Sequence, residues 1–342
     1  KAVDQQFKKT TWQVTYPINN YNITFYLGHF THFTTAYKDL KLDYYPLDYN
    51  LAKAKEQFRQ VQPMMRCFEE KFGFYPFKND SYKLVESPYL GMEHQSAVAY
   101  GNGYRNGYRG TDLSDTGIGL EFDFIIIHET AHEWFGNAIS VADIADMWIH
   151  EAFATYAEAV YVECELSNEK AVDYLNGIRN NITHNKAIVG NYGVNNEGSS
   201  DMYFKGANFV HTLRTVLNDD EKWWDLLRTF VSRYKYKTIN TDDVMAHFQS
   251  YFQLDLQPIF DQYLRYNKLP ELVIKKQNGR LEIKWLTDVA NFQMPIDINF
   301  EGKKERILAT NNWTELEQLS SIRSLRNQID RQNMYYDIRI ID

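Results

Sequence analysis

The chain has 342 residues, of which 44% are hydrophobic, including 25 tyrosines and 21 phenylalanines, and its formal net charge is −8. This length allows two or three domains around a large core. The acidic charge argues against nucleic-acid binding, which favours a basic surface. No run approaches the roughly 18 apolar residues of a membrane-spanning helix, so no transmembrane segment is expected.

The chain begins at Lys1 rather than Met and shows no signal segment, so we expect a processed, truncated or partial product. The expected protein is soluble, either exported or in the cell envelope, or alternatively cytoplasmic. Cys67 and Cys164 lie far apart in the sequence, and we expect two buried free thiols rather than a disulfide or metal ligands. The sequence does not indicate an oligomeric state.

Alternating, aromatic-rich patterns predict β-strands in the first 48 residues and again before the central part of the chain. Asn50 is the predicted N-cap of a helix that kinks at Pro63, reaches about Phe72 and ends at Gly73. The Gly-, Asn- and Arg-rich stretch 101–119 is a predicted loop. The predicted strands are Trp12–Tyr16, Tyr21–Leu27, Tyr82–Glu86 and His94–Tyr100.

From Phe122 to about Asn267 the pattern is mostly helical, and after Leu269-Pro270 it becomes strand-like. The later predicted helices are Tyr203–Leu217, Asp219–Tyr234, Thr241–Phe252 and Pro258–Tyr266. The predicted strands are Glu271–Lys276 and Leu281–Leu286, joined by a tight Asn278-Gly279 turn, then Met294–Phe300, Arg306–Ala309 and Tyr335–Ile341. We therefore expect a catalytic domain over 49–267 and a small antiparallel β module over 268–342, preceded by residues 1–48.

A metal-binding motif lies at the start of the helical part. In His128-Glu129-Thr130-Ala131-His132, the two histidines are four residues apart and share one helix face, so both can reach one metal ion. Glu129 is offset by one position and can face a metal-bound water without being a ligand. The apolar run 122–127 predicts that this helix is buried, and Gly136-Asn137 is its predicted end.

A third ligand is expected from the next helix, which runs from about Met147 to Val162 and carries Glu151 one turn inside. Helices joined by a short connection pack antiparallel, which brings Glu151 back to the histidine pair. Two histidines and one glutamate leave a fourth position open, which is typical of catalytic zinc. The alternative is a pair of hydrogen-bonded core histidines, but it would leave Glu129 and Glu151 buried without partners.

Four segments, which together span about a third of the chain, resemble the zinc aminopeptidases typified by aminopeptidase N and leukotriene hydrolase, the gluzincin metallopeptidases. Gly91-Met92-Glu93-His94 resembles the G-x-M-E-N exopeptidase motif, and the second segment is the histidine motif with Trp134-Phe135-Gly136-Asn137. The third, Trp148 to Tyr156, resembles W-L-N-E-G-F-A, and the fourth, Tyr203-Phe204-Lys205-Gly206-Ala207, resembles Y-x-K-G-A.

The resemblance implies an α+β fold with a thermolysin-like catalytic domain, mostly helical with a small mixed sheet, followed by a β-sandwich-like module. It implies one Zn²⁺ per chain and peptide substrates with a free N-terminus. The implied metal ligands are His128, His132 and Glu151, with Glu129 as the base that moves the proton of an activated water.

The resemblance also implies roles for residues that spacing alone does not single out. Tyr203 would donate a hydrogen bond to the oxyanion of the transition state. Glu93 would bind the substrate α-amine, and the strand with Gly91 and Met92 would pair with the peptide backbone. Glu93 could instead be a surface carboxylate beside a turn. His94 lines the same pocket or is structural, and His150 points to a different helix face from Glu151.

The chain also departs from the family pattern. The first glycine of the G-x-M-E-N motif is Leu90 here and its asparagine is His94, and His150 and Ala152 replace Asn and Gly beside Glu151. The long β domain that usually precedes the catalytic domain is represented at most by its last strands within residues 1–48, which puts the completeness of the amine pocket in question. The predicted activity is that of a zinc aminopeptidase. The alternatives are a thermolysin-like endopeptidase and an inactive peptide-binding scaffold.

Overall fold

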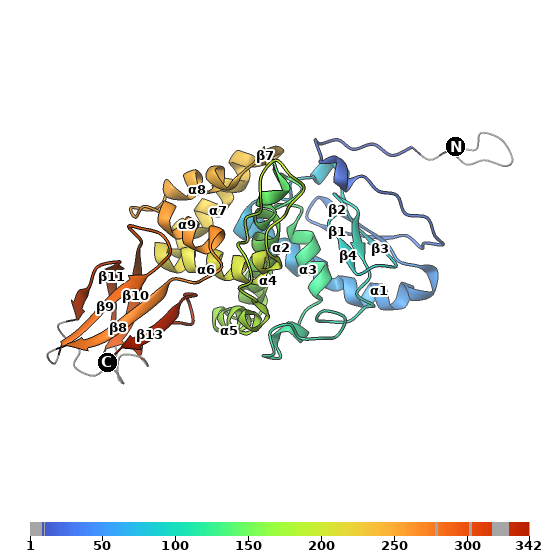
Figure 1. Cartoon of the computed structure of the whole chain (residues 1–342). Helices are drawn as coiled ribbons and strands as arrows, with labels where there is room; N and C mark the ends of the chain where they lie inside the picture. The colour runs from blue at the N-terminus through green and yellow to red at the C-terminus, as the bar shows by residue number, and fades with distance from the viewer. Residues whose placement is uncertain (1–8, 10, 278–279, 301–302, 317–327, 342) are drawn as a thin grey trace.

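The computed structural model describes residue 9 and residues 11–277, 280–300, 303–316 and 328–341. Figure 1 shows a small sheet and the N-terminal segment at one end, a central group of helices, and a β-rich C-terminal part at the other end. Most helices are grouped in the middle of the chain and most strands near its two ends, and the predicted α+β class is confirmed. Within the described ranges, no helix combines the length and apolar character needed to cross a membrane.

The N-terminal segment, residues 11–32, is extended, but no part of it belongs to a strand of a described sheet. The predicted strands Trp12–Tyr16 and Tyr21–Leu27 are therefore wrong. A strand requires a neighbour that completes its backbone hydrogen bonds, and the described sheets pair only strands that begin at Phe33 or later. The alternating pattern remains visible as exposed apolar side chains at Ile23, Phe25 and Leu27, which are 71%, 87% and 94% exposed.

A five-stranded mixed sheet follows, in the order β1-β2-β3-β5-β4. Its strands are β1 (Phe33–Tyr37), β2 (Leu40–Tyr45), β3 (Tyr82–Glu86), β4 (Gly91–Met92) and β5 (Val98–Tyr100). The prediction for Tyr82–Glu86 is confirmed, whereas only the end of His94–Tyr100 is a strand. The short β4 pairs with β5 alone and forms one edge of the sheet.

The helix predicted from Asn50 to Phe72 is interrupted. It consists of α1 (Leu51–Gln57) and α2 (Val61–Phe72), separated by a 3₁₀ turn over Phe58–Gln60, and it ends as predicted at Gly73, whose φ is 97°. The break lies just before Pro63, whose missing N–H falls harmlessly in the first turn of α2. Asn50 precedes α1, but its side chain donates to Glu86 instead of capping the helix.

The two helices of the motif region are α3 (Phe124–Ala131) and α4 (Trp148–Glu165). Asp123 caps α3 by accepting the backbone N–H groups of Ile125 and Ile126. The helix ends about one turn before the predicted stop at Gly136. Every residue of α4 from Trp148 to Val162 is buried, so this helix forms the centre of the core.

The remaining helices surround α4, with close contacts from α5 and α6. They are α5 (Asn168–Ile178), α6 (Phe204–Leu217), α7 (Asp220–Tyr234), α8 (Thr241–Gln249) and α9 (Gln257–Arg265), with a parallel pair of short strands, β6 (Ile139–Val141) and β7 (Lys237–Ile239). All predicted helices from Tyr203 onward are therefore confirmed, with ends that differ by up to three residues. Gly206 lets α6 approach α4 closely, since a Cβ there would lie 2.6 Å from that of Ala152.

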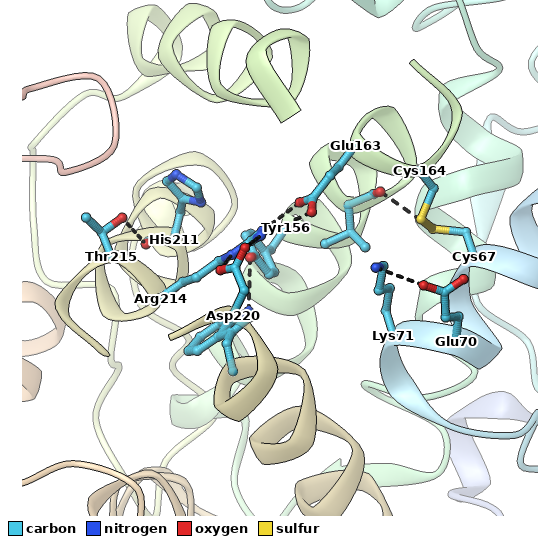
Figure 2. A network of polar contacts seen from close by, with 12 residues as sticks. Cys67, Glu70, Lys71, Tyr156, Glu163, Cys164, His211, Arg214, Thr215 and Asp220 are labelled. Carbon is cyan, nitrogen blue, oxygen red and sulfur yellow. Dashed lines mark hydrogen bonds and ion pairs between the residues drawn. A yellow bond between two sulfur atoms is a disulfide. The ribbon is translucent and has the colours of Figure 1, made fainter. Parts of the chain in front are cut away.

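Cys67 of α2 and Cys164 of α4 form a disulfide, with 6.0 Å between their Cα atoms, so the prediction of two free thiols is wrong (Figure 2). The two helices pack side by side, which brings together residues that are 97 positions apart in the sequence. Close to this bond, Arg214 of α6 pairs with Glu163 of α4 and with Asp220 at the start of α7. Covalent and ionic links thus fix the C-terminal end of α4.

The C-terminal part contains a four-stranded sheet in the order β12-β9-β8-β13 and a separate β10–β11 hairpin. Its strands are β8 (Glu271–Gln277), β9 (Arg280–Leu286), β10 (Gln293–Phe300), β11 (Lys303–Thr310), β12 (Thr314–Leu316) and β13 (Asp337–Ile341). The predicted β8–β9 hairpin is confirmed, while its Asn278-Gly279 turn lies outside the described residues.

The prediction of a purely antiparallel module is wrong, because β13 runs parallel to β8. Hydrogen bonds to the helical part hold the chain just before β13. The hydroxyl of Tyr263 donates to the carbonyl of Tyr335, and the backbone N–H of Tyr335 donates to the hydroxyl of Thr212. The N–H of Asp337 then bonds to the carbonyl of Pro270, so β13 starts beside the start of β8 and runs in the same direction.

Loss of the disulfide should destabilise the fold. A cross-link over 97 residues restricts the unfolded chain, and its removal typically costs about 2–5 kcal/mol. We expect the Cys67→Ala/Cys164→Ala variant to lose about this much free energy of unfolding in urea denaturation. The unmodified chain treated with reductant should behave like the variant, and equal stabilities of oxidised and reduced protein would contradict the prediction.

The buried His211 on α6 should make folding sensitive to acid. Burial, with a contribution from Arg214, lowers its pKa to about 3, whereas in the unfolded chain it titrates near 6.5. Below about pH 6.5 the unfolded state therefore binds one more proton, and stability falls by up to about 1.4 kcal/mol per pH unit.

In the His211→Phe variant, we expect the unfolding free energy to fall less steeply between pH 6.5 and pH 4. The slope should be smaller by about 1.4 kcal/mol per pH unit, which corresponds to one proton fewer taken up on unfolding. Urea denaturation at several pH values measures the slope. The exposed His29, changed to Gln, is the matched control and should leave the slope unchanged. The same slope in the His211→Phe variant would show that this residue does not contribute.

Candidate active site

Two helices bring three potential metal ligands together. His128 lies in α3, His132 is the C-cap residue directly after it, and Glu151 lies in the first turn of α4. The Nε2 atoms of the two histidines are 3.3 Å apart, and Oε2 of Glu151 lies 3.4 Å from His128 Nε2 and 3.5 Å from His132 Nε2. The structure therefore places the three predicted ligand atoms in a nearly equilateral triangle.

This triangle fits a tetrahedral zinc ion. Ligand atoms about 2.0–2.1 Å from a tetrahedral metal lie about 3.3 Å from one another, and the observed separations match that spacing. Oε2 of Glu151 is buried and makes no hydrogen bond to the part of the chain that the structure describes. A buried carboxylate oxygen without a hydrogen bond is costly unless a cation is bound.

The other ring nitrogen of each histidine is occupied. His128 Nδ1 lies 2.7 Å from Oε1 of Glu158, and His132 Nδ1 lies 3.0 Å from the carbonyl of Phe135. When Nδ1 donates in these bonds, the lone pair of each Nε2 is directed into the site. The second oxygen of Glu158 accepts a hydrogen bond from Tyr174.

Glu158 was not identified from the sequence. The available signal was its position seven residues after Glu151, two turns along the same face of a helix whose other neighbours are apolar. Such a carboxylate in a buried helix requires a partner, and the partner is a histidine of the motif.

The carboxylates make the site attractive to positive charge. Burial alone would lower the pKa of His132, but Glu151 and Glu93 outweigh burial and raise it to about 9. Burial alone would raise the pKa of Glu151, yet His132 and His128 hold it below its usual value. Glu151 is therefore ionised and available as a ligand.

Glu129 lies against the backbone of β4. A Cβ added to Gly91 would lie only 2.5 Å from Oε1 of Glu129, so the absence of a side chain at position 91 makes room for this carboxylate. Burial raises the pKa of Glu129 to about 7, against the opposing effect of His128 and His132. A carboxylate with this pKa can accept and release a proton near neutrality.

Glu93 follows β4 and is buried beside Glu129 and His132, with one potential ligand atom of each within 4.8 Å of the others. Its backbone carbonyl accepts a hydrogen bond of 2.7 Å from Asn137, and Oε1 accepts one of 3.3 Å from Tyr21. The alternative of a surface carboxylate is wrong. Asn137 and Tyr21 were not assigned to the site from the sequence.

Tyr203 immediately precedes α6, and its ring stacks on that of His128 with centroids 6.0 Å apart. Burial, together with Glu151, Glu93 and Glu129, raises the pKa of the Tyr203 phenol above its ordinary value, so it remains a hydrogen-bond donor.

The remaining predicted residues flank this centre. Met92 and Gly91 form β4, and the half-buried His94 lies 3.4 Å from the hydroxyl of Tyr89 and edge-on to Tyr26. His150 is buried and accepts the backbone N–H of Val141, so it points away from the ligand triangle.

Two histidines and a carboxylate around an open position, with a separate buried carboxylate as base, are typical of metallohydrolases. The chain matches the family model of the "Peptidase family M1 domain" over residues 56–263, more than half of its length. The chain therefore belongs to peptidase family M1, whose members include metallopeptidases named as aminopeptidases.

Individual relatives are distant. The chain is 30% identical to human aminopeptidase RNPEPL1 over 37% of this chain and 19% of that protein. It is 21% identical to bovine glutamyl aminopeptidase over 84% of this chain and 31% of that protein. It is 25% identical to mouse aminopeptidase N over 70% of this chain and 27% of that protein. The chain thus aligns with no more than about a third of the length of these relatives.

Zinc affinity should depend on Glu158. In the Glu158→Gln variant, His128 loses its carboxylate partner and becomes a weaker ligand, so we expect zinc to bind about 10-fold to 100-fold more weakly. Competition with a chromogenic chelator measures the affinity. The control is Glu165→Gln, on the same helix but paired with Arg66 at the surface, and it should bind zinc normally. Unchanged affinity in Glu158→Gln would contradict this prediction.

Proposed function

We propose that this chain carries the catalytic centre of a zinc-dependent aminopeptidase that hydrolyses the N-terminal peptide bond of peptides. The observation that supports this best is the position of Glu93, a second buried carboxylate beside the base Glu129 and the ligand His132. A metal site alone would serve any metallohydrolase. A carboxylate at this distance provides a partner for the positively charged amine of a peptide N-terminus.

His128, His132 and Glu151 would hold one Zn²⁺ per chain. When bound, such an ion polarises a carbonyl group and makes water more acidic, which is the chemistry that peptide hydrolysis requires. The three ligands leave one side of the triangle for substrate and water.

Glu129 would move the proton. Its carboxylate accepts a proton from the attacking water and then donates it to the leaving amine. Gly91 supports this role, because a larger residue there would displace the carboxylate from its place against β4. Tyr203 would donate its phenolic hydrogen to the oxygen of the scissile carbonyl as negative charge develops there.

Glu93 would select for a free N-terminus. An ammonium group gives the buried carboxylate a partner, whereas an acetylated N-terminus leaves it unpaired. The free edge of β4, with Gly91 and Met92, offers backbone groups that an extended peptide could pair with. His94 is placed to line the same pocket.

We propose the same three-part organisation that the sequence predicts. Residues 49–267 would be a thermolysin-like catalytic domain, residues 268–342 a β module, and residues 1–48 the end of a preceding β domain or the start of the catalytic one. The Cys67–Cys164 disulfide supports an exported or cell-envelope location, because such bonds persist in oxidising compartments.

The proposal is tested with aminoacyl fluorogenic substrates that carry either a free or an acetylated amine. We expect cleavage of the free-amine set only, loss of activity with a chelator, and recovery with zinc. The Glu129→Gln variant should still bind zinc but lose about 10²-fold to 10⁴-fold in kcat.

Two outcomes would favour the alternatives. Equal cleavage of acetylated substrates, or of internal bonds in a longer peptide, would identify a thermolysin-like endopeptidase. Zinc binding without cleavage of any substrate would identify an inactive peptide-binding scaffold. Glu93→Ala separates the first two readings, because it should reduce the preference for a free amine only in an aminopeptidase.

A further inference from the structure

The N-terminal segment contributes a side chain to the proposed amine pocket. Tyr21 lies in a short 3₁₀ turn, η1 (Asn20–Asn22), 72 positions before Glu93. Its hydroxyl donates a hydrogen bond to Oε1 of Glu93 at 3.3 Å. The ring is partly buried, although the apolar side chains that follow it along the segment are exposed.

Specific contacts hold this turn in place from both sides. Before it, Asn19 donates to the hydroxyl of Ser140 on β6, and Tyr16 stacks on Tyr236 with ring centroids 5.3 Å apart. After it, Tyr26 donates to the carbonyl of Ala97, just before β5. The segment is therefore fixed across the site by polar and aromatic contacts rather than by strand pairing.

The surroundings of Glu93 favour a neutral Tyr21 hydroxyl as its hydrogen-bond donor. Glu93 lies buried beside Glu129 and His132, with one potential ligand atom of each within 4.8 Å of the others. Burial, Glu93 and Glu151 all raise the pKa of Tyr21, which keeps the phenol neutral and able to donate. The phenol can therefore donate its hydroxyl hydrogen to one oxygen of the Glu93 carboxylate.

We propose that Tyr21 is a positioning residue for the substrate amine: by bonding one oxygen of Glu93, it fixes the direction of the carboxylate and leaves the second oxygen for the ammonium group. This inference rests on the proposed role of Glu93 in amine recognition. It assigns a substrate-positioning function to the N-terminal segment.

The test is Tyr21→Phe, which removes only the hydroxyl. For the free-amine aminoacyl amidocoumarin that the unmodified chain cleaves best, we expect KM to rise about 10-fold, since a hydrogen bond to a charged group is lost. We expect kcat to change by less than about 3-fold, because neither the base nor the metal ligands are touched. Calorimetric binding of the corresponding amino-acid amide should weaken by a similar factor.

Tyr16→Phe is the matched control. Its hydroxyl accepts the N–H of Asn79, and it belongs to the same segment but makes no contact with Glu93. If the segment acts only as structural support, both variants should behave alike and lose thermal stability together. A KM effect confined to Tyr21→Phe, with an unchanged melting temperature, supports the positioning role.

A double-mutant cycle with Glu93→Ala tests whether Tyr21 acts through Glu93. In the Glu93→Ala background, Tyr21→Phe should have no further effect on KM. An unchanged or lower KM in the single Tyr21→Phe variant, or an equal further loss in the Glu93→Ala background, would overturn the inference. The proposed aminopeptidase function would still stand after such a result if Glu93→Ala reduces the preference for a free amine. If the unmodified chain shows no preference for a free amine, both the proposed function and the role of Tyr21 fail.

Discussion

The burial of Glu151 beside two histidines is the interaction on which the site depends. A carboxylate removed from water is unfavourable unless opposite charge or hydrogen bonds compensate. Here Oε2 of Glu151 has no hydrogen bond within the described residues. The two histidine rings that face it are fixed through their other nitrogen, Nδ1, which contacts Glu158 in His128 and a backbone carbonyl in His132. The packing of α3 on α4 thus brings together three buried side chains that could hold a cation.

Helix α4 carries both residues of the candidate site and residues that stabilise the fold. Glu151 stands in its first turn, Glu158 two turns later, and Glu163 and Cys164 at its far end. Because α4 is buried from Trp148 to Val162, a shift of this helix would move Glu151, Glu158 and Cys164 together. Gly206 matters for the same reason, since it sets how closely α6 can approach. The packing of this helix on all sides places Oε2 of Glu151 3.4 Å and 3.5 Å from the Nε2 atoms of His128 and His132.

Local patterns predicted much of this arrangement. The histidine spacing, the helix carrying Glu151 and the helices from Tyr203 onward follow from periodicity and caps that act over a few residues. Other features depend on which elements meet in space. The disulfide joins helices 97 positions apart, and β13 runs parallel to β8 because contacts with the helical part set its direction. Glu158 and Tyr21 gain their significance only from neighbours that the fold supplies. The strands predicted at Trp12–Tyr16 and Tyr21–Leu27 failed because a strand needs a partner, which the pattern itself cannot provide.

The exposed stretch after Tyr21 has a consequence for proteolysis. Ile23, Phe25 and Leu27 are exposed and belong to none of the sheets that the described residues form. Exposed segments of this kind are preferred sites of proteolytic cleavage. A single cut there would break the covalent link between Tyr21 and the rest of the chain and leave it held by noncovalent contacts, such as those of Asn19 with Ser140 and of Tyr16 with Tyr236. His128, His132 and Glu151 would stay buried in the core. Such a nicked molecule would keep the three proposed zinc ligands and Glu129, but the hydrogen bond from Tyr21 to Glu93 would no longer be secured by the chain itself. Under the proposed function, limited proteolysis would therefore weaken the selection for a free amine and leave the residues of the metal site in place.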